Sequence, residues 1–266
     1  MNKSELLEKY SKPEDKLLIS KLLDKSEECK RKNIVTYTDF LDMYQLKIAQ
    51  KVLHATECNY IFFGGYEEAS RSLAIIYPEK LTEEMVLNTI NNYVQIVRIE
   101  LPKNLYGEYE HRDYLSGIMK LGIKREKFGD IIVEKNGADV VVSKELAEYL
   151  EQNVKQLTRF SKSNITLQNV EDIRKIELKK EDIKIVIQSL RLDSIVAQLA
   201  NTSRTKANEI ILQGRVFINY EEQYKTDKQV KENDVIVIRG KGKFEINKIE
   251  GATRKNKIIL SVKKYI

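Results

Sequence analysis

The stretch RLDSIVAQLANTSRTKANEIILQGRVFIN, residues 191–219, sets the architecture of the C-terminal part of the chain. Its first apolar stripe consists of Leu192, Ile195, Val196 and Leu199. This spacing of i, i+3, i+4 and i+7 predicts one short helix with a single buried face. Ser203 is the natural N-cap of a second helix, and Gly214 is its expected left-handed stop. Residues 216–219 and 234–238 follow as predicted strands, so two helices turn back on each other before a pair of strands.

The positive charge of the chain is concentrated in the same region. Residues 191–266 carry 16 lysines and arginines against 9 aspartates and glutamates, whereas residues 1–190 carry 30 against 31. The net charge of +6 therefore comes from the C-terminal region. Clustered positive charge indicates a nucleic-acid partner, because each neutralised phosphate releases condensed counterions. Composition alone leaves one alternative open, a solvated lysine-rich tail without a partner.

A series of short motifs runs through this basic region. The motifs are Arg191-Leu192-Asp193, Ser203-Arg204, Ala207, Ile211, Gly214-Arg215-Val216, Asn219, Lys228, Val230 and Asp234-Val235-Ile236. The series resembles the RNA-binding S4 domain, which is named after the ribosomal protein. The resemblance implies two helices locked together by their apolar stripes, with cations on the other side directed at RNA phosphates.

The residues expected to contact RNA are mainly cationic. They are Arg191, Ser203, Arg204, Lys206, Arg215, Asn219, Lys228 and Lys241. The arginines and lysines would contact phosphates, because their charges match the RNA backbone. Ser203 would cap the second helix and also face RNA, and Asn219 would hydrogen-bond a ribose or the backbone.

The N-terminal region is predicted to be helical, followed by two paired strands. Residues 1–57 have helical apolar spacing, with Thr38 or Asp39 as the expected cap of a second helix. Residues 60–66 and 72–77 are the strand-like runs, and a polar turn separates them. The glycine pair between these strands lacks the Lys-Ser/Thr of a phosphate loop, so we expect a bend where backbones approach closely.

The middle region alternates strands and helices. In order, the predicted elements are a strand at 94–101, a helix at 112–121, a hairpin at 130–142, a helix after Ser143 and a strand at 165–170. The hairpin turns at Asn136-Gly137, a strong signal for a two-residue loop. This order predicts an RRM-like (ferredoxin-like) arrangement. Base stacking on its sheet is not expected, because 138–142 is aliphatic apart from one aspartate.

A second basic segment lies near the end of the helix at 112–121. Its cations, with one from the start of that helix, are Arg112, Lys120, Lys124, Arg125 and Lys127. We consider these residues a possible second RNA contact. A solvated loop after a helix is the alternative that the sequence leaves open.

The fold class expected for the whole chain is α+β with three domains. Residues 1–78 form a helical domain with a small hairpin, 79–180 an RRM-like domain, and 181–266 an S4 RNA-binding domain with a C-terminal strand. A charged segment at 171–182 would link the last two domains.

The region upstream of residue 181 contains further motifs. They are Phe62-Phe63-Gly64-Gly65-Tyr66, His111-Arg112-Asp113-Tyr114-Leu115, Leu121-Gly122-Ile123-Lys124-Arg125-Glu126-Lys127 and Gly129-Asp130-Ile131. With the S4 segment, this set resembles the YlmH-type S4-domain proteins of Gram-positive bacteria and cyanobacteria. One departure is Tyr114-Leu115-Ser116-Gly117, where relatives commonly carry Leu-Gly after the His-Arg-Asp triplet. The resemblance implies a non-enzymatic protein that binds the large ribosomal subunit and its tRNA, takes part in rescuing stalled nascent chains, and has a gene context linked to cell division.

The sequence contains no complete catalytic signature. His111-Arg112-Asp113 has the letters of a kinase catalytic loop, but the required asparagine spacing and the Gly-rich loop are missing. Cys29 and Cys58 cannot form a zinc site of four close ligands, so we expect neither metal nor cofactor. Two alternatives stay open: an RNA-modifying enzyme with an S4 targeting domain and a site around the His-Arg-Asp triplet, or a protein-interaction adaptor linked to cell division.

The composition fits an ordered globular protein, with 42% hydrophobic and 32% charged residues. The first ten residues, MNKSELLEKY, lack the apolar core of a signal peptide, and no later stretch approaches the roughly 20 apolar residues that span a bilayer. We therefore expect a cytoplasmic monomer without membrane insertion. The expected partner is structured RNA on the large ribosomal subunit. It is rRNA in the first place, with tRNA as a second candidate.

Overall fold

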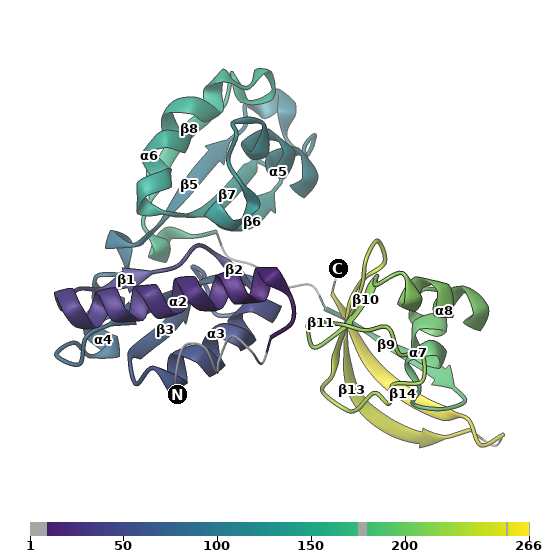
Figure 1. The fold of residues 1–266 in the computed structure, drawn as a ribbon. Coiled ribbons are helices and arrows are strands. Elements are labelled where there is room, and N and C mark those ends of the chain that lie inside the picture. The colour runs from purple at the N-terminus through teal and green to yellow at the C-terminus, as the bar shows by residue number, and fades with distance from the viewer. Residues whose placement is uncertain (1–9, 175–179, 254, 266) are drawn as a thin grey trace. The chain divides into compact units, whose positions relative to one another are not determined.

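The computed structural model describes residues 10–174, 180–253 and 255–265, and the chain divides into two compact units (Figure 1). The first unit is Met1–Ile176 and the second is Glu177–Ile266. Both units mix helices and sheets, which confirms the α+β class. Part of the predicted charged linker, 175–179, lies outside the described residues. The division into three domains stays a prediction.

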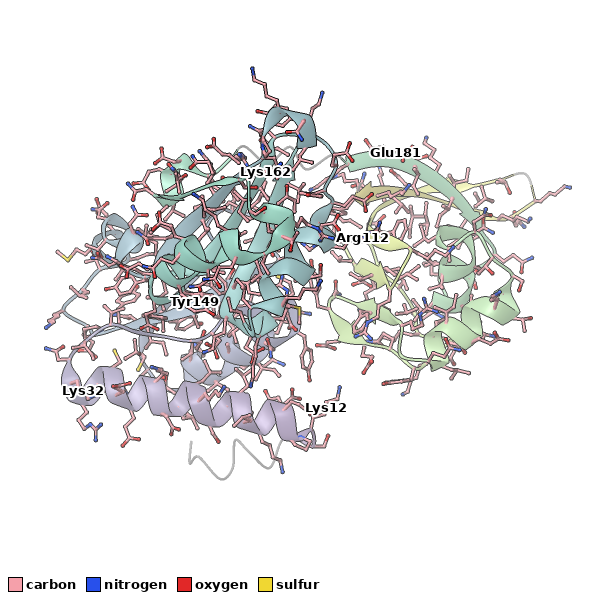
Figure 2. All side chains as sticks on the ribbon, turned by 90° about the horizontal axis from the view of Figure 1, so that it is seen from above. Lys12, Lys32, Arg112, Tyr149, Lys162 and Glu181 are labelled. Atoms are coloured by element: carbon pink, nitrogen blue, oxygen red, sulfur yellow. The ribbon has the colours of Figure 1, made fainter. Side chains whose placement is uncertain are left out.

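The N-terminal half of the first unit combines helices with a small sheet. Its elements are α2 (Pro13–Lys32), β1 (Thr36–Tyr37), β2 (Leu41–Asp42), α3 (Met43–Ala55), β3 (Asn59–Phe63), β4 (Arg71–Tyr77) and α4 (Glu83–Asn88). Figure 2 shows α2 as one long helix between the labelled Lys12 and Lys32. It begins at a proline and carries acidic residues in its first turn and basic ones in its last, as the helix dipole favours.

The predicted cap of the second helix is wrong. The helix α3 begins after Asp42, whose carboxylate accepts a hydrogen bond from the Gln45 backbone N–H at 2.9 Å. The Gln45 side chain accepts from the Asp42 N–H at 3.0 Å, which completes a capping box. Thr38 and Asp39 instead lie between β1 and β2, because both of these short strands pair with β4. That pairing is long-range, so local helix signals could not reveal it.

The predicted pair of strands is confirmed, since β3 and β4 run antiparallel from Asn59↔Tyr77 to Phe63↔Leu73. The glycine bend after β3 is also confirmed. A Cβ on Gly64 would collide with the Ala69 side chain and the Arg71 carbonyl, so only glycine fits this close approach.

The middle part of the first unit is a four-stranded sheet with two helices. Its elements are β5 (Val94–Glu100), α5 (His111–Lys120), β6 (Phe128–Glu134), β7 (Gly137–Ser143), α6 (Lys144–Asn153) and β8 (Asn164–Gln168). Short 3-10 helices lie at Ile90–Asn92, Lys103–Leu105, Arg125–Lys127, Val154–Gln156, Thr158–Phe160 and Val170–Asp172. The strand order is β6-β7-β5-β8 and all pairs are antiparallel, which is compatible with the predicted RRM-like arrangement.

The two faces of this sheet are both buried. On one face the β5 residues Val97 and Ile99 join a core with Tyr114 of α5 and Leu150 of α6. On the other face Val94, Ile96 and Val141 pack with residues from the N-terminal half; these partners include Phe40, Leu73 and Ile75. The N-terminal and middle parts therefore share a core, and the sheet face that an RRM offers to bases is covered.

The second unit contains the two helices expected from the apolar stripes. Its elements are β9 (Lys180–Ile187), α7 (Leu192–Leu199), α8 (Arg204–Leu212), β10 (Val216–Ile218), β11 (Glu221–Glu222), β12 (Val235–Ile238), β13 (Gly242–Ala252) and β14 (Ile258–Tyr265). The Ser203 Oγ accepts a hydrogen bond from the Lys206 N–H at 3.2 Å, and Gly214 has φ +67°, so both predicted helix boundaries are confirmed.

The sheet of the second unit is larger than expected. Its order is β11-β10-β12-β13-β14-β9, with every pair antiparallel. The predicted single C-terminal strand is one arm of the long β13–β14 hairpin, which Figure 1 shows in yellow. The strand β9 joins the far edge of this sheet by pairing with β14. One continuous core lies between the sheet and the two helices.

In the described part of the chain, none of the helices is long and apolar enough to cross a membrane.

Candidate nucleic-acid interface

A basic hollow of about 270 Å³ lies in the second unit, between α8 and the end of β12. Its lining residues are Lys206, Glu209, Ile210, Gln213, Arg215, Ile238, Arg239 and Lys241. Four of these carry positive charge and one carries negative charge, so the hollow has a net positive charge. Its four cations are exposed, whereas Ile238 is buried beneath them. We call this site the basic groove.

The backbone of the strands β10 and β12 holds two arginines of the basic groove together. The Arg239 N–H donates to the Arg215 carbonyl at 2.9 Å, and the Arg215 Nη2 donates to the Arg239 carbonyl at 3.1 Å. The Arg239 guanidinium also lies 4.8 Å from the centre of the Phe217 ring, a cation–π distance. The two guanidinium groups are thus positioned by the fold before any ligand arrives, which lowers the entropy lost on binding.

A buried carboxylate, Asp193, holds two further predicted RNA contacts. The Arg204 Nη2 lies 3.0 Å from both oxygens of Asp193, and the Arg191 Nη2 lies 2.9 Å from its Oδ2. The Asp193 side chain is 3% exposed, whereas those of Arg191 and Arg204 are 37% and 47% exposed. Burial favours a higher pKa for Asp193, but hydrogen bonds and charges from the two arginines outweigh it, so the pKa lies below its ordinary value.

The consequence is that the predicted cations form two sets. Lys206, Arg215 and Lys241 line the basic groove, whereas Arg191 and Arg204 share the carboxylate of Asp193. The second set contributes less net charge, because one carboxylate offsets one of its two guanidiniums.

The remaining predicted contacts in this unit have different positions. The side chain of Lys228 is exposed. Its backbone carbonyl accepts the Leu192 N–H at 2.8 Å, so Lys228 lies beside the start of α7. The side chain of Ser203 serves as the cap of α8. The Asn219 Nδ2 donates to the Asp234 Oδ1 at 2.7 Å, and the Asn219 Oδ1 accepts from the Val235 N–H at 2.9 Å. Both ends of the Asn219 amide thus stabilise the turn after β10, and an RNA contact at this residue stays a prediction.

The predicted second contact does not form one free basic patch. Lys120 and Lys124 are exposed, and Arg112 is highly exposed with its Nε 3.3 Å from a Glu110 oxygen. The Lys127 Nζ lies 2.7 Å from Asp39, and this pair raises the lysine pKa by its hydrogen bond.

Arg125 is turned toward the protein. Its Nη1 donates to the carbonyls of Phe128 and Gly129 at 2.7 and 3.0 Å, and its guanidinium lies 4.6 Å from the centre of the Phe128 ring. Arg125 and Lys127 therefore have intramolecular partners, unlike the solvated loop that the sequence left open as the alternative, and the second RNA contact stays a prediction.

Sequence reasoning missed Arg239 and the anchoring role of Asp193. The alternation Arg239-Gly240-Lys241-Gly242-Lys243 was a usable signal, because glycines at a turn let neighbouring cations approach one ligand.

Among the residues that the structure describes, no cluster of three histidine, cysteine, aspartate or glutamate side chains could hold a metal ion.

Comparisons with known proteins place these features in a family. Residues 88–185 match the family model described as "Putative RNA-binding domain in YlmH", and residues 190–236 match the S4 domain. The chain is 31% identical over 223 residues to "Ribosome-associated protein quality control protein P2" of Bacillus subtilis (strain 168), covering 83% of each chain. A solved structure, "Cell division protein ylmH from Streptococcus pneumoniae", is 17% identical with a TM-score of 0.49, and the match covers 62% of this chain and 98% of that one. By its identity to the Bacillus relative and its two matching domains, the chain belongs to the YlmH family of S4-domain proteins.

Proposed function

We propose that this protein binds structured RNA, associates with the large ribosomal subunit through rRNA and tRNA, and acts in ribosome-associated quality control. The observation that carries this proposal is the basic groove, with four cations and one carboxylate around an apolar floor. The two matching family models support RNA binding, and the printed name of the Bacillus relative supports association with the ribosome.

The chemistry of the basic groove suits phosphates. Guanidinium groups bind phosphate oxygens in pairs, and lysine ammonium groups add point charge. Such contacts fix the position of RNA by its shape and backbone but carry little sequence information. A folded RNA with a defined spacing of phosphates, as in the ribosome, is therefore a better ligand for the basic groove than an arbitrary single strand.

We propose a non-enzymatic role for the first unit as well. The Asp113 Oδ2 accepts the Glu110 N–H at 2.8 Å, and its Oδ1 lies 3.0 Å from the Arg159 Nη1. The carboxylate of the His-Arg-Asp triplet thus caps α5, which gives it a structural role. Mass spectrometry of RNA incubated with the protein, with and without a methyl donor, should detect no new modification; a new mass would refute this part of the proposal.

The main test is sedimentation of tagged protein in lysate at low and high salt. We expect the protein to migrate with large subunits at low salt and to dissociate at high salt, because phosphate contacts weaken as salt rises. The double variant Arg215→Ala/Lys241→Ala should stay near the top of the gradient. Arg31→Ala/Lys51→Ala is the matched control, since it removes the same charge from exposed positions in α2 and α3. Equal migration of the groove variant and the wild type would refute the proposed interface.

A further inference from the structure

Two half-buried arginines in the first unit lack a close counter-charge. The Arg71 Nη2 donates to the Phe40 carbonyl at 2.7 Å. The Arg125 Nη1 donates to the carbonyls of Phe128 and Gly129. Neither guanidinium forms an ion pair with another described residue, and the Arg71 Nε is buried without a hydrogen-bond partner. Charged side chains are rarely buried without such a partner, because desolvation disfavours the isolated charge.

Asp130, the carboxylate whose charge acts on both arginines, is already engaged. Its Oδ2 accepts hydrogen bonds from the Tyr66 hydroxyl at 2.7 Å and the Ser70 N–H at 2.6 Å. Asp42 and Glu126 also act on Arg71 through their charges, although the Asp42 carboxylate caps α3. Arg125 is influenced by one carboxylate, Asp130, and is repelled by Arg71.

The electrostatics of this cluster agree with its geometry. Burial, together with the positive charge of Arg71, lowers the pKa of Arg125 to about 10, although Asp130 opposes both effects. Burial also lowers the pKa of Arg71. Two desolvated cations that repel each other would be stabilised by an added anion.

His111 gives this cluster an open side. It is the first residue of α5, which packs against β6, and much of its surface is exposed. The surrounding protein nevertheless partly desolvates the imidazole. This desolvation and the positive charge of Arg125 lower the pKa of His111, while the negative charge of Asp130 opposes them. The His111 side chain is exposed and makes no hydrogen bond to another described residue, and the Nε and Nη2 of Arg125 are not buried without a partner.

We propose that Arg125 and His111, backed by Arg71, form a phosphate-binding site that takes a backbone phosphate of an RNA strand. Phosphate suits the site because its oxygens can accept from the free N–H groups of a guanidinium and from an imidazolium together. RNA is the favoured source because exposed cations flank the cluster on α5 and just after it, at Arg112, Lys120 and Lys124. The site rests on the proposed RNA-binding function but is separate from the basic groove.

The test uses the two histidines of the full chain, His111 and His54, as reporters in NMR pH titrations. Inorganic phosphate is added first, and a ribosomal RNA hairpin in a separate titration. We expect each ligand to raise the pKa of His111 by roughly half a unit or more, because a nearby anion favours the imidazolium. His54 lies on α3 and should not respond.

The possible outcomes separate this site from the basic groove. RNA binding without any change at His111 refutes this site and leaves the proposed function standing. A response to inorganic phosphate without a response to RNA refutes the assignment to an RNA strand. If the protein fails to bind RNA at all, the proposed function falls with that assignment.

Variants provide a second readout in the form of the salt dependence of RNA affinity. Arg125→Gln and His111→Gln should each weaken binding, and Arg125→Gln should lower the slope of log affinity against log salt by about 1. His111 is exposed, so its variant should fold even if Arg125→Gln does not. Arg31→Gln, an exposed position at the end of α2, is the matched control. Unchanged affinity and slope in the His111 and Arg125 variants would overturn the proposal.

Discussion

Replacing Asp193 by asparagine should destabilise the second unit while preserving the volume of the side chain. Asp193 joins two arginines that lie on either side of it in the chain, so its loss leaves two guanidiniums without their shared counter-charge. Breaking a fully buried pair costs about 3–5 kcal/mol. Because Arg191 and Arg204 are 37% and 47% exposed, water can rehydrate them, and we expect a smaller loss of about 2 kcal/mol.

The assay is hydrogen exchange of the full-length protein, followed by mass spectrometry of peptides from α7 and α8. A loss of 2 kcal/mol corresponds to roughly 30-fold faster exchange through opening of this unit. Peptides from β5 in the first unit should be unaffected. Asp182→Asn is the matched control, because this aspartate is exposed on β9 and should change stability by less than about 0.5 kcal/mol.

The pH dependence of urea unfolding provides an independent check. The folded pKa of Asp193 is lowered, so its stabilising effect is complete above the unfolded pKa of about 3.9 and is lost as pH falls through the folded pKa. The difference between wild type and Asp193→Asn should therefore be constant from about pH 5 to 8 and shrink below about pH 4. Equal stability at pH 7, or a difference that grows in acid, would refute the reasoning.

Three further predictions concern backbone, cap and ligand. Gly137→Ala should lower the thermal midpoint seen by circular dichroism much more than Gly122→Ala: both glycines have positive φ, but a Cβ on Gly137 would collide with a β5 carbonyl and one on Gly122 meets nothing. Similar midpoints would contradict this. Ser203→Ala should cost about 1 kcal/mol in urea unfolding and Ser143→Ala less, since only Ser203 makes a side-chain cap; equal losses would count against it. Arg239→Ala should lower the salt slope of RNA binding by about 1, and an unchanged slope would remove Arg239 from the interface.

The sequence predicted those elements whose signals are local. The stripe at Leu192–Leu199 and the cap at Ser203 define α7 and α8 by spacing alone, and the structure has both. The start of α3 was mispredicted because two-residue strands are stabilised by a distant partner, β4, which local spacing does not report. The same limit applies to β9, whose partner β14 lies at the far end of the chain.

The candidate site was predictable to a similar extent. A motif identifies cations but does not show where their charge is directed: Lys206 and Arg215 line the basic groove, while Arg204 is held by Asp193. Polar residues are harder still, because an amide such as that of Asn219 can satisfy a turn as well as a ribose.

The shared core of the first unit has a consequence for its evolution and dissection. A fragment that begins at residue 88 keeps the middle sheet but removes the strands and the phenylalanine that cover Val94, Ile96 and Val141. Such a fragment would present an aliphatic face to water and be prone to self-association. The middle sheet is thus a scaffold whose flat face is permanently occupied, so new ligand contacts can arise only on its helices, loops and edges. Substitutions at Phe40 and at the β5 face must compensate one another, and the two parts are expected to be inherited together.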